Sequence, residues 1–407
     1  MGALRLIVLV GLFVSACGVT KPPERDVPES PKLPAQASVS DTSPGAPGGA
    51  SSEGEASDSA PVTETDDGGD DVDTETPGTN AGSTTGGCDT RTATAASACT
   101  AAFQPDSGTE TFDRPTTRFF TVLQGSANHR GIDTIVNPGD EQILIGKFAY
   151  GPFDADLVHE KVEVWIERQC GAWSKIGTTW TSDDGDYPTT NGVSDTGGRV
   201  FFRVPVAAAL PAGDFRVKML VKGDHSEANF WLHVWPKGTR AVVSDIDGTM
   251  TTQETDGAWS WLDANSPLAQ TGAPELMQAY FAKGYRIINL TARPERLTNG
   301  TRQWFLDNGF PRGTFHLAQS NIGELGSAAY EYKRAYLDEL VNDKGVLFDA
   351  AIGNKDTDLN AYLDAGIDPA RITLIEGEYD GDLMGATRVA DYLAAAQNVG
   401  CLAPIRP

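Results

Sequence analysis

The chain has 407 residues with 56 acidic and 32 basic side chains, for a formal net charge of −24. This composition argues against nucleic acid as a partner, because the sequence has no basic stripe that would neutralise phosphates. Nearly half of the negative charge belongs to residues 18–87, which hold 14 acidic and 3 basic residues. The roughly 295 residues that follow residue 113 suit two folded domains.

The amino terminus has the pattern of an export signal. Arg5 precedes an apolar run at residues 6–14, which is too short to span a bilayer as a stable helix and has the length of a signal-peptide core. The sequence VSAC that ends at Cys17 resembles the lipobox of bacterial lipoproteins. The resemblance implies that residues 1–16 are removed and that Cys17 is lipidated, which anchors the protein to a membrane of the bacterial cell envelope. Gly18 follows where aspartate would indicate the inner membrane, so we expect the outer membrane; the alternative is an ordinary secretory signal.

Residues 17–113 are predicted to be a disordered tether. Up to residue 87 they are mostly Pro, Gly, Ser, Thr, Ala and acidic residues, with almost no aromatic or large aliphatic side chains. Such a segment buries too little apolar surface to offset the entropy of ordering it. Its acidic residues repel one another, so we expect an extended spacer between the membrane and the folded domains.

Four cysteines remain when the lipidated one is set aside: Cys88, Cys99, Cys170 and Cys401. An even number in an exported chain indicates two disulfides, with three possible connectivities. The simplest arrangement joins Cys88 to Cys99 across a short loop and leaves Cys170 and Cys401 to clip the carboxyl terminus onto the middle domain. No spacing of cysteine and histidine indicates a zinc site.

Residues 114–237 are predicted to form an all-β domain. Apolar side chains occupy every second position at residues 162–166, 215–221 and 230–234, which is the period of a strand with one buried face. Clusters of Gly, Pro, Asp and Asn separate these stretches. Seven or more strands at this spacing suggest an immunoglobulin-like sandwich. It contains no catalytic constellation, so we expect a spacer, a positioning device or a ligand-binding module.

Residues 238–407 are predicted to form an α/β domain with a Rossmann-like parallel sheet. Strands are expected at residues 241–244, 285–290, 314–317, 347–352 and 372–375, and helices at 273–283, 294–308, 328–341 and 359–364. Gly284, Gly309 and Gly366 follow helical runs, where a left-handed capping residue is required. Alternation of strand and helix indicates a parallel sheet that is covered on both faces.

The first strand of this domain runs into Asp245-Ile246-Asp247-Gly248-Thr249. Alternate side chains of an extended segment share a face, so both aspartates can point the same way at the carboxyl end of the strand. In open parallel sheets that end is where ligands bind. One carboxylate can attack phosphorus while the other donates and accepts a proton, provided that a divalent cation offsets the negative charge. The alternative is an acidic turn after an edge strand.

Other segments bring polar residues to the same rim: Thr291 and Arg293 after the second strand, Lys333 on a helix, and Asn354 and Asp358 after the fourth strand. With the motifs GYRIINLTARPERL, GFPRGTF and GNKDTDLNAYLDAGI, the pattern resembles the haloacid dehalogenase-like superfamily. It is especially similar to the lipin-type phosphatidate phosphatase domain and to the carboxyl-terminal domain of the large phosphatidylinositol transfer proteins. The likeness covers roughly residues 241–379.

The resemblance implies a catalytic role for both aspartates. Asp245 corresponds to the nucleophile that forms an aspartyl-phosphate, and Asp247 to the acid that protonates the leaving alkoxide and then activates water. The carboxylate of Asp245, the backbone carbonyl of Asp247 and the side chain of Asn354 would hold Mg²⁺, a hard cation suited to oxygen ligands. Many superfamily members have an acid at the position of Asn354, whereas the lipin-like group has asparagine.

The resemblance also implies a phosphate-binding set, formed by Thr291, Lys333, Arg293 and the backbone at Gly248 and Thr249. Lys333 would neutralise the phosphate and the nucleophile.

Each of these residues has an ordinary alternative. Asp358 would orient the ammonium of Lys333, or would only cap a helix. Thr291 could cap the next helix. Lys333 could be solvated, with Lys344 as a rival, and Arg293 and Lys355 could form surface salt bridges.

The intervals between the motifs leave no room for a large cap domain, since about forty residues separate Asp247 from Thr291 and about forty more lead to Lys333. An open site can accept a bulky substrate. Trp259 and Trp261 would lie in a loop beside it, where they suit either a bilayer interface or packing against the β-domain.

The leading hypothesis is a membrane-tethered, magnesium-dependent phosphatase of phosphomonoesters, with phosphatidic acid as the implied substrate. A phospholipid-binding module without turnover and a phosphatase of soluble periplasmic phosphoesters are the alternatives. The transfer-protein relatives motivate the binding module, because their matching domain lacks the first acid, which is present here as Asp245.

Overall fold

The computed structural model describes residues 102–105, 108, 110–252, 267–320, 322–377 and 379–405. The predicted signal peptide, Cys17, Cys88 and Cys99, most of the predicted tether, and the tryptophans 259 and 261 lie outside the described residues. In the described part of the chain, no helix has the length and apolar character needed to cross a membrane.

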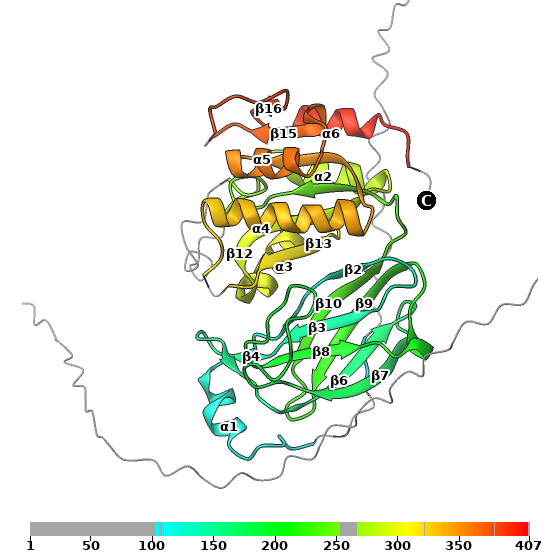
Figure 1. Cartoon of the computed structure of the whole chain (residues 1–407), viewed down its shortest axis with the longest axis vertical. Coiled ribbons are helices and arrows are strands. Elements are labelled where there is room, and N and C mark those ends of the chain that lie inside the picture. The colour runs from blue at the N-terminus through cyan, green and yellow to red at the C-terminus, as the bar shows by residue number, and fades with distance from the viewer. Residues whose placement is uncertain are drawn as a thin grey trace, which may run out of the picture. The chain divides into compact units, whose positions relative to one another are not determined.

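The amino-terminal folded region is a β-sandwich preceded by helix α1 (Thr117–Phe120) and the short helix η1 (Val122–Gln124). One sheet has the order β1-β3-β8 and the other the order β2-β10-β9-β6-β7 (Figure 1). The strands are β1 (Arg130–Gly131), β2 (Thr134–Val136), β3 (Ile143–Lys147), β6 (Lys161–Glu167), β7 (Trp173–Trp180), β8 (Arg199–Arg203), β9 (Gly213–Val221) and β10 (Glu227–Val234), with β4 (Ala149–Tyr150) and β5 (Ala155–Asp156) as a separate hairpin. The predicted sandwich is confirmed, and its immunoglobulin-like character stays a prediction.

The core of the sandwich follows the period of two read from the sequence. Val162, Val164 and Ile166 of β6 are fully buried in it. The described chain also contacts this region before residue 114. The ring of Phe103 meets the rings of Trp165 and Trp173 edge-on, at centroid distances of 5.4 and 5.1 Å. The contacts with the sandwich therefore begin inside the segment that we predicted to be tether.

The carboxyl-terminal region contains a six-stranded sheet with the order β13-β12-β11-β14-β15-β16, in which every pair is parallel. Its strands are β11 (Arg240–Ser244), β12 (Arg286–Pro294), β13 (Thr314–Ala318), β14 (Leu347–Gly353), β15 (Ile372–Ile375) and β16 (Thr387–Val389). The helices are α2 (Ala273–Ala282), α3 (Thr298–Asp307), α4 (Ser327–Asp338), α5 (Asp356–Asp364) and α6 (Leu393–Gly400), and the π-helical segment η5 (Glu339–Asp343) continues α4. The predicted α/β class is confirmed.

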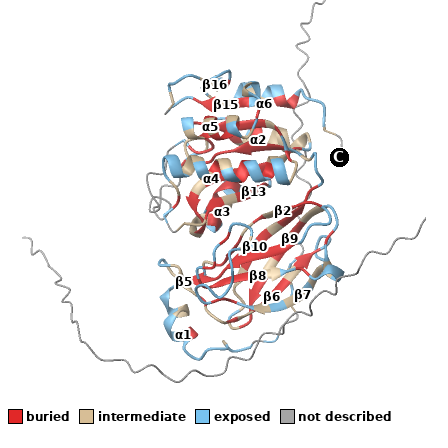
Figure 2. Ribbon diagram, in the orientation of Figure 1, coloured by how far each residue is buried: buried red, intermediate tan, exposed pale blue. Residues whose placement is uncertain are grey.

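Helices cover both faces of this parallel sheet, whose strands are largely buried (Figure 2). Val243 of β11 packs in one core with residues of α4 and α5. Val242 packs in a second core with residues of α2, α3 and α6. Neighbouring side chains of a strand point to opposite faces, so the two cores lie on opposite sides of the sheet. This two-sided burial explains the uninterrupted apolar run of β11.

Four elements differ from the prediction: β12, α3, β16 and α6. The helix expected at residues 294–308 begins later, because β12 continues to Pro294 after a register shift against β13, and α3 begins at Thr298. Strand β16 and helix α6 were not predicted. The capping glycines are confirmed, since Gly284, Gly309 and Gly366 all have positive φ angles, of 96°, 75° and 77°.

Candidate active site

The parallel sheet has a topological switch point beside its first strand. From β11 the chain builds β12 and β13 on one side, and then crosses over to β14 on the other. Asp245 directly follows β11, and Asn354 directly follows β14. The backbone amide of Asp245 donates to Ile352 O at 2.9 Å, so the pairing of the two strands carries on to the aspartate. Ligands bind at such a switch point in open α/β sheets.

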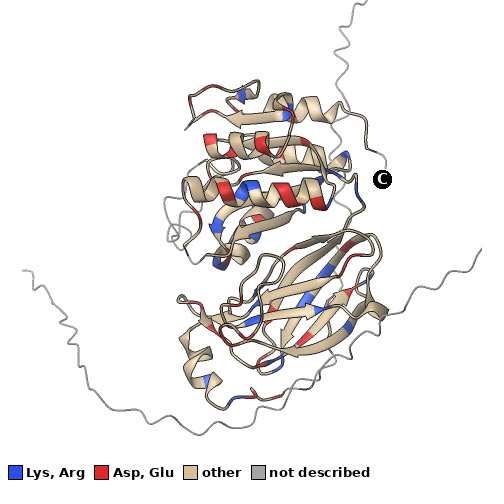
Figure 3. Cartoon of the chain, viewed as in Figure 1, with Lys and Arg blue, Asp and Glu red and all other residues tan. Residues whose placement is uncertain are grey.

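Lys333 on α4 lies between two carboxylates at this point. Its Nζ donates to Oδ1 of Asp245 and to Oδ1 of Asp358, in both cases at 2.6 Å. The three side chains are 6%, 6% and 1% exposed. Helix α4 carries charges of both signs (Figure 3), and Lys333 is the buried one among them. The alternative of a solvated lysine is therefore wrong, and the rival Lys344 lies near Glu339 instead.

Oxygen atoms of Asp245 and Asn354 converge on one hydroxyl group. Thr249 Oγ1 lies 3.2 Å from Asp245 Oδ2 and 3.0 Å from Asn354 Oδ1. Carboxylate and amide oxygens that converge in this way fit a hard cation such as Mg²⁺. Asp245 and Asn354, two of the three residues predicted to hold the metal, thus lie close together, and Mg²⁺ stays a prediction.

Asp358 serves two purposes that we had treated as alternatives. Its Oδ2 accepts hydrogen bonds from the backbone amides of Asn354, at 3.0 Å, and Lys355, at 3.2 Å. Its Oδ1 accepts from Lys333. One carboxylate therefore caps the amino terminus of α5 and fixes the lysine ammonium.

Asp247 is held by Arg293 in a bidentate ion pair. Nε of Arg293 donates to Oδ2 of Asp247 and its NH2 donates to Oδ1, both at 2.7 Å. The arginine side chain is 3% exposed, so it does not form the surface salt bridge considered above. Thr291 Oγ1 donates to the same carboxylate at 3.3 Å and accepts from the amide of Arg293 at 3.2 Å. The predicted residues thus fall into two adjacent groups, one around Asp245 and one around Asp247.

The backbone after Asp247 is engaged in its own turn. The amide of Gly248 donates to Thr251 Oγ1 at 3.0 Å, and the amide of Thr249 donates to Ile246 O at 3.2 Å. Gly248 adopts a φ of 70°, a conformation that suits glycine. In this structure the two amides that we predicted to cradle phosphate are therefore already hydrogen-bonded.

The electrostatics of the Asp245 group favour an additional cation. Burial raises the pKa of Asp245, and Asp358 and Asp247 reinforce this effect against the attraction of Lys333. Burial alone would lower the pKa of Lys333, but the neighbouring Asp245 and Asp358 raise it overall, so the lysine stays charged. Two carboxylates facing one ammonium leave an excess of one negative charge, which a bound cation would offset.

Tyr392 is a residue of the site that sequence reasoning missed. It is fully buried, and its hydroxyl donates to the backbone oxygen of Thr249 at 3.1 Å. Burial raises its pKa. No motif or period surrounds Tyr392, and its distance along the chain from Thr249 gave no signal for the contact.

The cysteine predictions are tested only in part. Cys170 and Cys401 are both disulfide-bonded. Because Cys88 and Cys99 lie outside the described residues, the connectivity stays a prediction.

The site is therefore a buried aspartate–lysine–aspartate cluster at the topological switch point of a doubly wound α/β domain. These features define its class. Comparisons with known families agree with this class. Residues 242–376 match the family model of the LNS2 domain of PITM 1-3, and residues 127–234 match that of the PITM 1-3 beta-sandwich domain. These matches support the lipin-related, haloacid dehalogenase-like superfamily that the motifs indicated.

Individual relatives match well over half of the chain. The chain is 30% identical over 289 residues to the protein retinal degeneration B of Drosophila melanogaster, which covers 69% of this chain and 21% of the relative. It is 30% identical over 253 residues to human membrane-associated phosphatidylinositol transfer protein 1, covering 61% of this chain and 18% of the relative. The chain thus spans about a fifth of the length of the curated relatives that it matches.

Proposed function

We propose that this protein is a magnesium-dependent phosphatase that hydrolyses a phosphomonoester, with phosphatidic acid as the substrate. The observation that carries the proposal is the buried ammonium of Lys333, held 2.6 Å from both Asp245 and Asp358 at the switch point of the sheet. We further propose that a lipid on Cys17 anchors the protein to the cell envelope and so brings the site to membrane-borne substrate.

In the proposed reaction, a carboxylate oxygen of Asp245 attacks phosphorus, the bond to the leaving alkoxide breaks, and an aspartyl-phosphate forms. Asp247 donates a proton to the alkoxide and later takes one from the water that hydrolyses the intermediate. Lys333 stabilises the charge that develops on the phosphoryl oxygens. Mg²⁺, held by Asp245, Asn354 and the backbone carbonyl of Asp247, would offset the charge of the nucleophile and phosphate.

The bidentate pair between Arg293 and Asp247 bears on this mechanism. An arginine that donates to both oxygens of a carboxylate fixes the orientation of that carboxylate. In the proposed phosphatase, Arg293 thus orients the carboxylate that donates and accepts the proton. The second candidate function is binding of anionic phospholipid without turnover, in which the guanidinium of Arg293 would pair with the lipid phosphate, and relatives named as phosphatidylinositol transfer proteins are consistent with it.

The test is phosphate release from phosphatidic acid vesicles by the full chain, with and without Mg²⁺, beside Asp245→Asn. We expect magnesium-dependent release that the substitution reduces by at least about a hundredfold, because the nucleophile is lost. Asp307→Asn, at an exposed aspartate of α3, is the matched control. A soluble phosphomonoester assayed in parallel distinguishes a lipid phosphatase from a general one. Vesicle binding without release by either protein would instead establish the binding module.

A further inference from the structure

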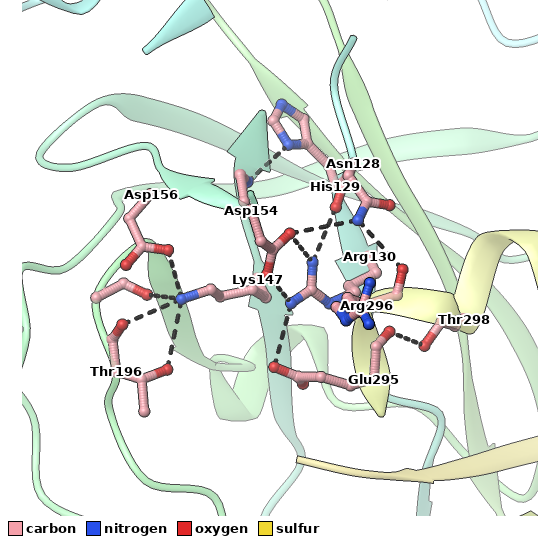
Figure 4. Close-up of polar contacts among 12 residues, drawn as sticks. Asn128, His129, Arg130, Lys147, Asp154, Asp156, Thr196, Glu295, Arg296 and Thr298 are labelled. Atoms are coloured by element: carbon pink, nitrogen blue, oxygen red, sulfur yellow. Dashed lines mark hydrogen bonds and ion pairs between the residues drawn. The ribbon is translucent and has the colours of Figure 1, made fainter. Parts of the chain in front are cut away.

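A buried cluster of charges joins the β-sandwich to the segment that follows the site residues Thr291 and Arg293. Glu295 comes directly after β12, and its side chain is 10% exposed. Arg199 of the sandwich donates to it through NH2 at 2.6 Å and NH1 at 3.3 Å, and Arg130 donates at 3.3 Å. The two arginine side chains are 1% and 3% exposed. Figure 4 shows Glu295 pointing toward Arg130.

The sandwich balances its other buried cations by itself. Arg130 forms a bidentate pair with Asp154, at 2.8 and 2.6 Å, and Lys147 pairs with Asp156 at 2.6 Å (Figure 4). Among the described residues, the carboxylate paired with Arg199 is that of Glu295. A buried cation without its partner is strongly unfavourable. The buried positive charge of Arg199 in the sandwich is therefore balanced by Glu295 of the α/β domain.

Neutral hydrogen bonds hold the same segment at further points. Asn128 Nδ2 donates to the backbone oxygen of Arg296 at 3.2 Å, and Asn299 Nδ2 donates to the backbone oxygen of His129 at 2.9 Å. One turn further along α3, Arg302 reaches back to the sandwich through an ion pair. The segment from 295 to 302 is thus fixed to the sandwich along its length.

This fixed segment also contacts Arg293, the arginine that pairs with Asp247. Arg293 lies two residues before Glu295, and its NH1 donates to Thr301 Oγ1 at 3.1 Å while its other nitrogens hold Asp247. The guanidinium is therefore oriented by α3, and α3 is oriented by the sandwich. We propose that the sandwich sets the geometry of the active site through Glu295, which acts as a positioning residue for Arg293 and Asp247.

The same strand offers a matched control at its opposite end. Arg286, the first residue of β12, pairs with Asp214 of the sandwich at 2.6 Å. This pair also joins the two domains, but it lies at the amino end of the strand, away from Asp245 and Asp247. If the loss of any contact between the domains lowered kcat, substitutions at either end of β12 would lower it. If Glu295 positions the site, only the substitution at the Glu295 end lowers kcat.

The proposal rests on the proposed phosphatase, and the test compares Glu295→Gln with Arg286→Gln in the full chain. On phosphatidic acid vesicles with Mg²⁺, we expect Glu295→Gln to lower kcat by about tenfold or more with little change in KM, because small displacements of acid and substrate slow chemistry before they weaken binding. Arg286→Gln should leave kcat unchanged. Glu295→Asp, which keeps the charge, should recover part of the loss.

A milder variant covers the case in which Glu295→Gln does not fold. Asn299→Ala removes two neutral hydrogen bonds of an exposed residue, to His129 O and Asn128 Oδ1, and leaves every buried charge paired. We expect it to lower kcat by about threefold, again without a change in KM. Unchanged kcat in both Asn299→Ala and a folded Glu295→Gln would overturn the proposal, as would an equal loss in Arg286→Gln.

A second readout separates this proposal from the function on which it rests. The ¹H–¹⁵N signal of Arg293 Nε reports its pairing with Asp247 whether or not the protein turns over substrate. We expect the signal to shift or broaden in Glu295→Gln and to stay in place in Arg286→Gln. Absence of turnover in the wild type with this pattern of shifts would overturn the phosphatase and keep the positioning role. An Arg293 signal that is the same in all three proteins would overturn the positioning role.

Discussion

Burial decides which charged residues of this protein have large energetic effects. Lys333 and Arg293 are both nearly inaccessible to solvent, and each is paired with aspartate. Removing one partner of a buried pair typically costs about 3–5 kcal/mol, because the other charge is left unpaired. The pair of Arg334 and Glu331 on the same helix as Lys333 is exposed and contributes little. Charged residues of the same type thus contribute very different free energies in the folded chain, depending on how deeply they are buried.

Stability should depend on pH through the buried His129. Its Nδ1 accepts from the amide of Ala149 at 3.2 Å and its Nε2 lies 2.8 Å from Ser226 Oγ, which satisfies the neutral ring. Burial lowers its pKa from 6.5 to about 4. Between these values the unfolded chain binds a proton that the folded chain excludes, so stability falls as the pH falls.

In the wild type, we expect the contribution of His129 to lower the unfolding free energy by about 2–3 kcal/mol when the pH falls from 7 to 4.5. His129→Asn should lose that much less over the same interval, as measured by urea unfolding at both values. The same substitution at His159, whose side chain is 41% exposed, is the control. An identical pH dependence in wild type and His129→Asn would contradict the expectation.

At the scale of elements, the junction between β14 and α5 shapes the candidate site. β14 ends at Gly353, and α5 begins at Asp356 with the carboxylate of Asp358 turned back onto the amides of the connection. A Cβ atom placed on Gly353 would lie 2.5 Å from Cβ of Asp358. The glycine is therefore required by the close approach of the strand end to the first turn of the helix.

Gly353→Ala and Gly300→Ala should have opposite effects on stability. The first should lower the unfolding free energy by about 1–3 kcal/mol through overpacking, and it should displace Asp358 from Lys333. The second, at an exposed position inside α3 with open space around it, should raise stability by about 0.5–1 kcal/mol. Chemical denaturation of both variants checks the signs. A stabilising Gly353→Ala would show that the strand end can move away from the helix.

At the scale of the molecule, the sandwich and the α/β domain share packing as well as ion pairs. Ile135 of β2 and Trp235, just after β10, lie in the same buried core as Val243 of β11 and Leu337 of α4. Trp235 is 2% exposed, and its Nε1 donates to Asp214 at 2.8 Å. A core that continues from one domain into the other couples their unfolding.

We therefore expect the folded region of the full chain to unfold in one calorimetric transition. Trp235→Ala should cost about 3–5 kcal/mol and separate the transition into two, because it removes a large side chain from the shared core. Trp180→Ala, at a position that is 47% exposed, should leave a single transition. Two transitions already present in the wild type would show that the domains unfold independently.

Much of the fold could be predicted because its signals are local. The period of two in β6, the apolar run of β11 and the glycines after the helices each reflect the geometry of a few neighbouring residues. Strand β16 and helix α6 escaped because they are short and carry weak patterns. The extension of β12 to Pro294 depends on its pairing with β13, which no local pattern encodes.

The motifs indicated the residues of the candidate site and the contacts of Lys333 with Asp245 and Asp358, but not the pairing of Asp247 with Arg293. The sequence by itself determined the class of fold and brought Asp245, Asp247, Lys333 and Asn354 to one rim, because the carboxyl ends of parallel strands meet there. Only the tertiary structure decided that Arg293 faces Asp247 and that Arg199 faces Glu295. Arg293 lies 46 positions from Asp247 in the chain, and Arg199 lies 96 positions from Glu295. Contacts at such separations arise when whole elements pack and bury their charges, and this packing is why the second carboxylate of the motif meets Arg293.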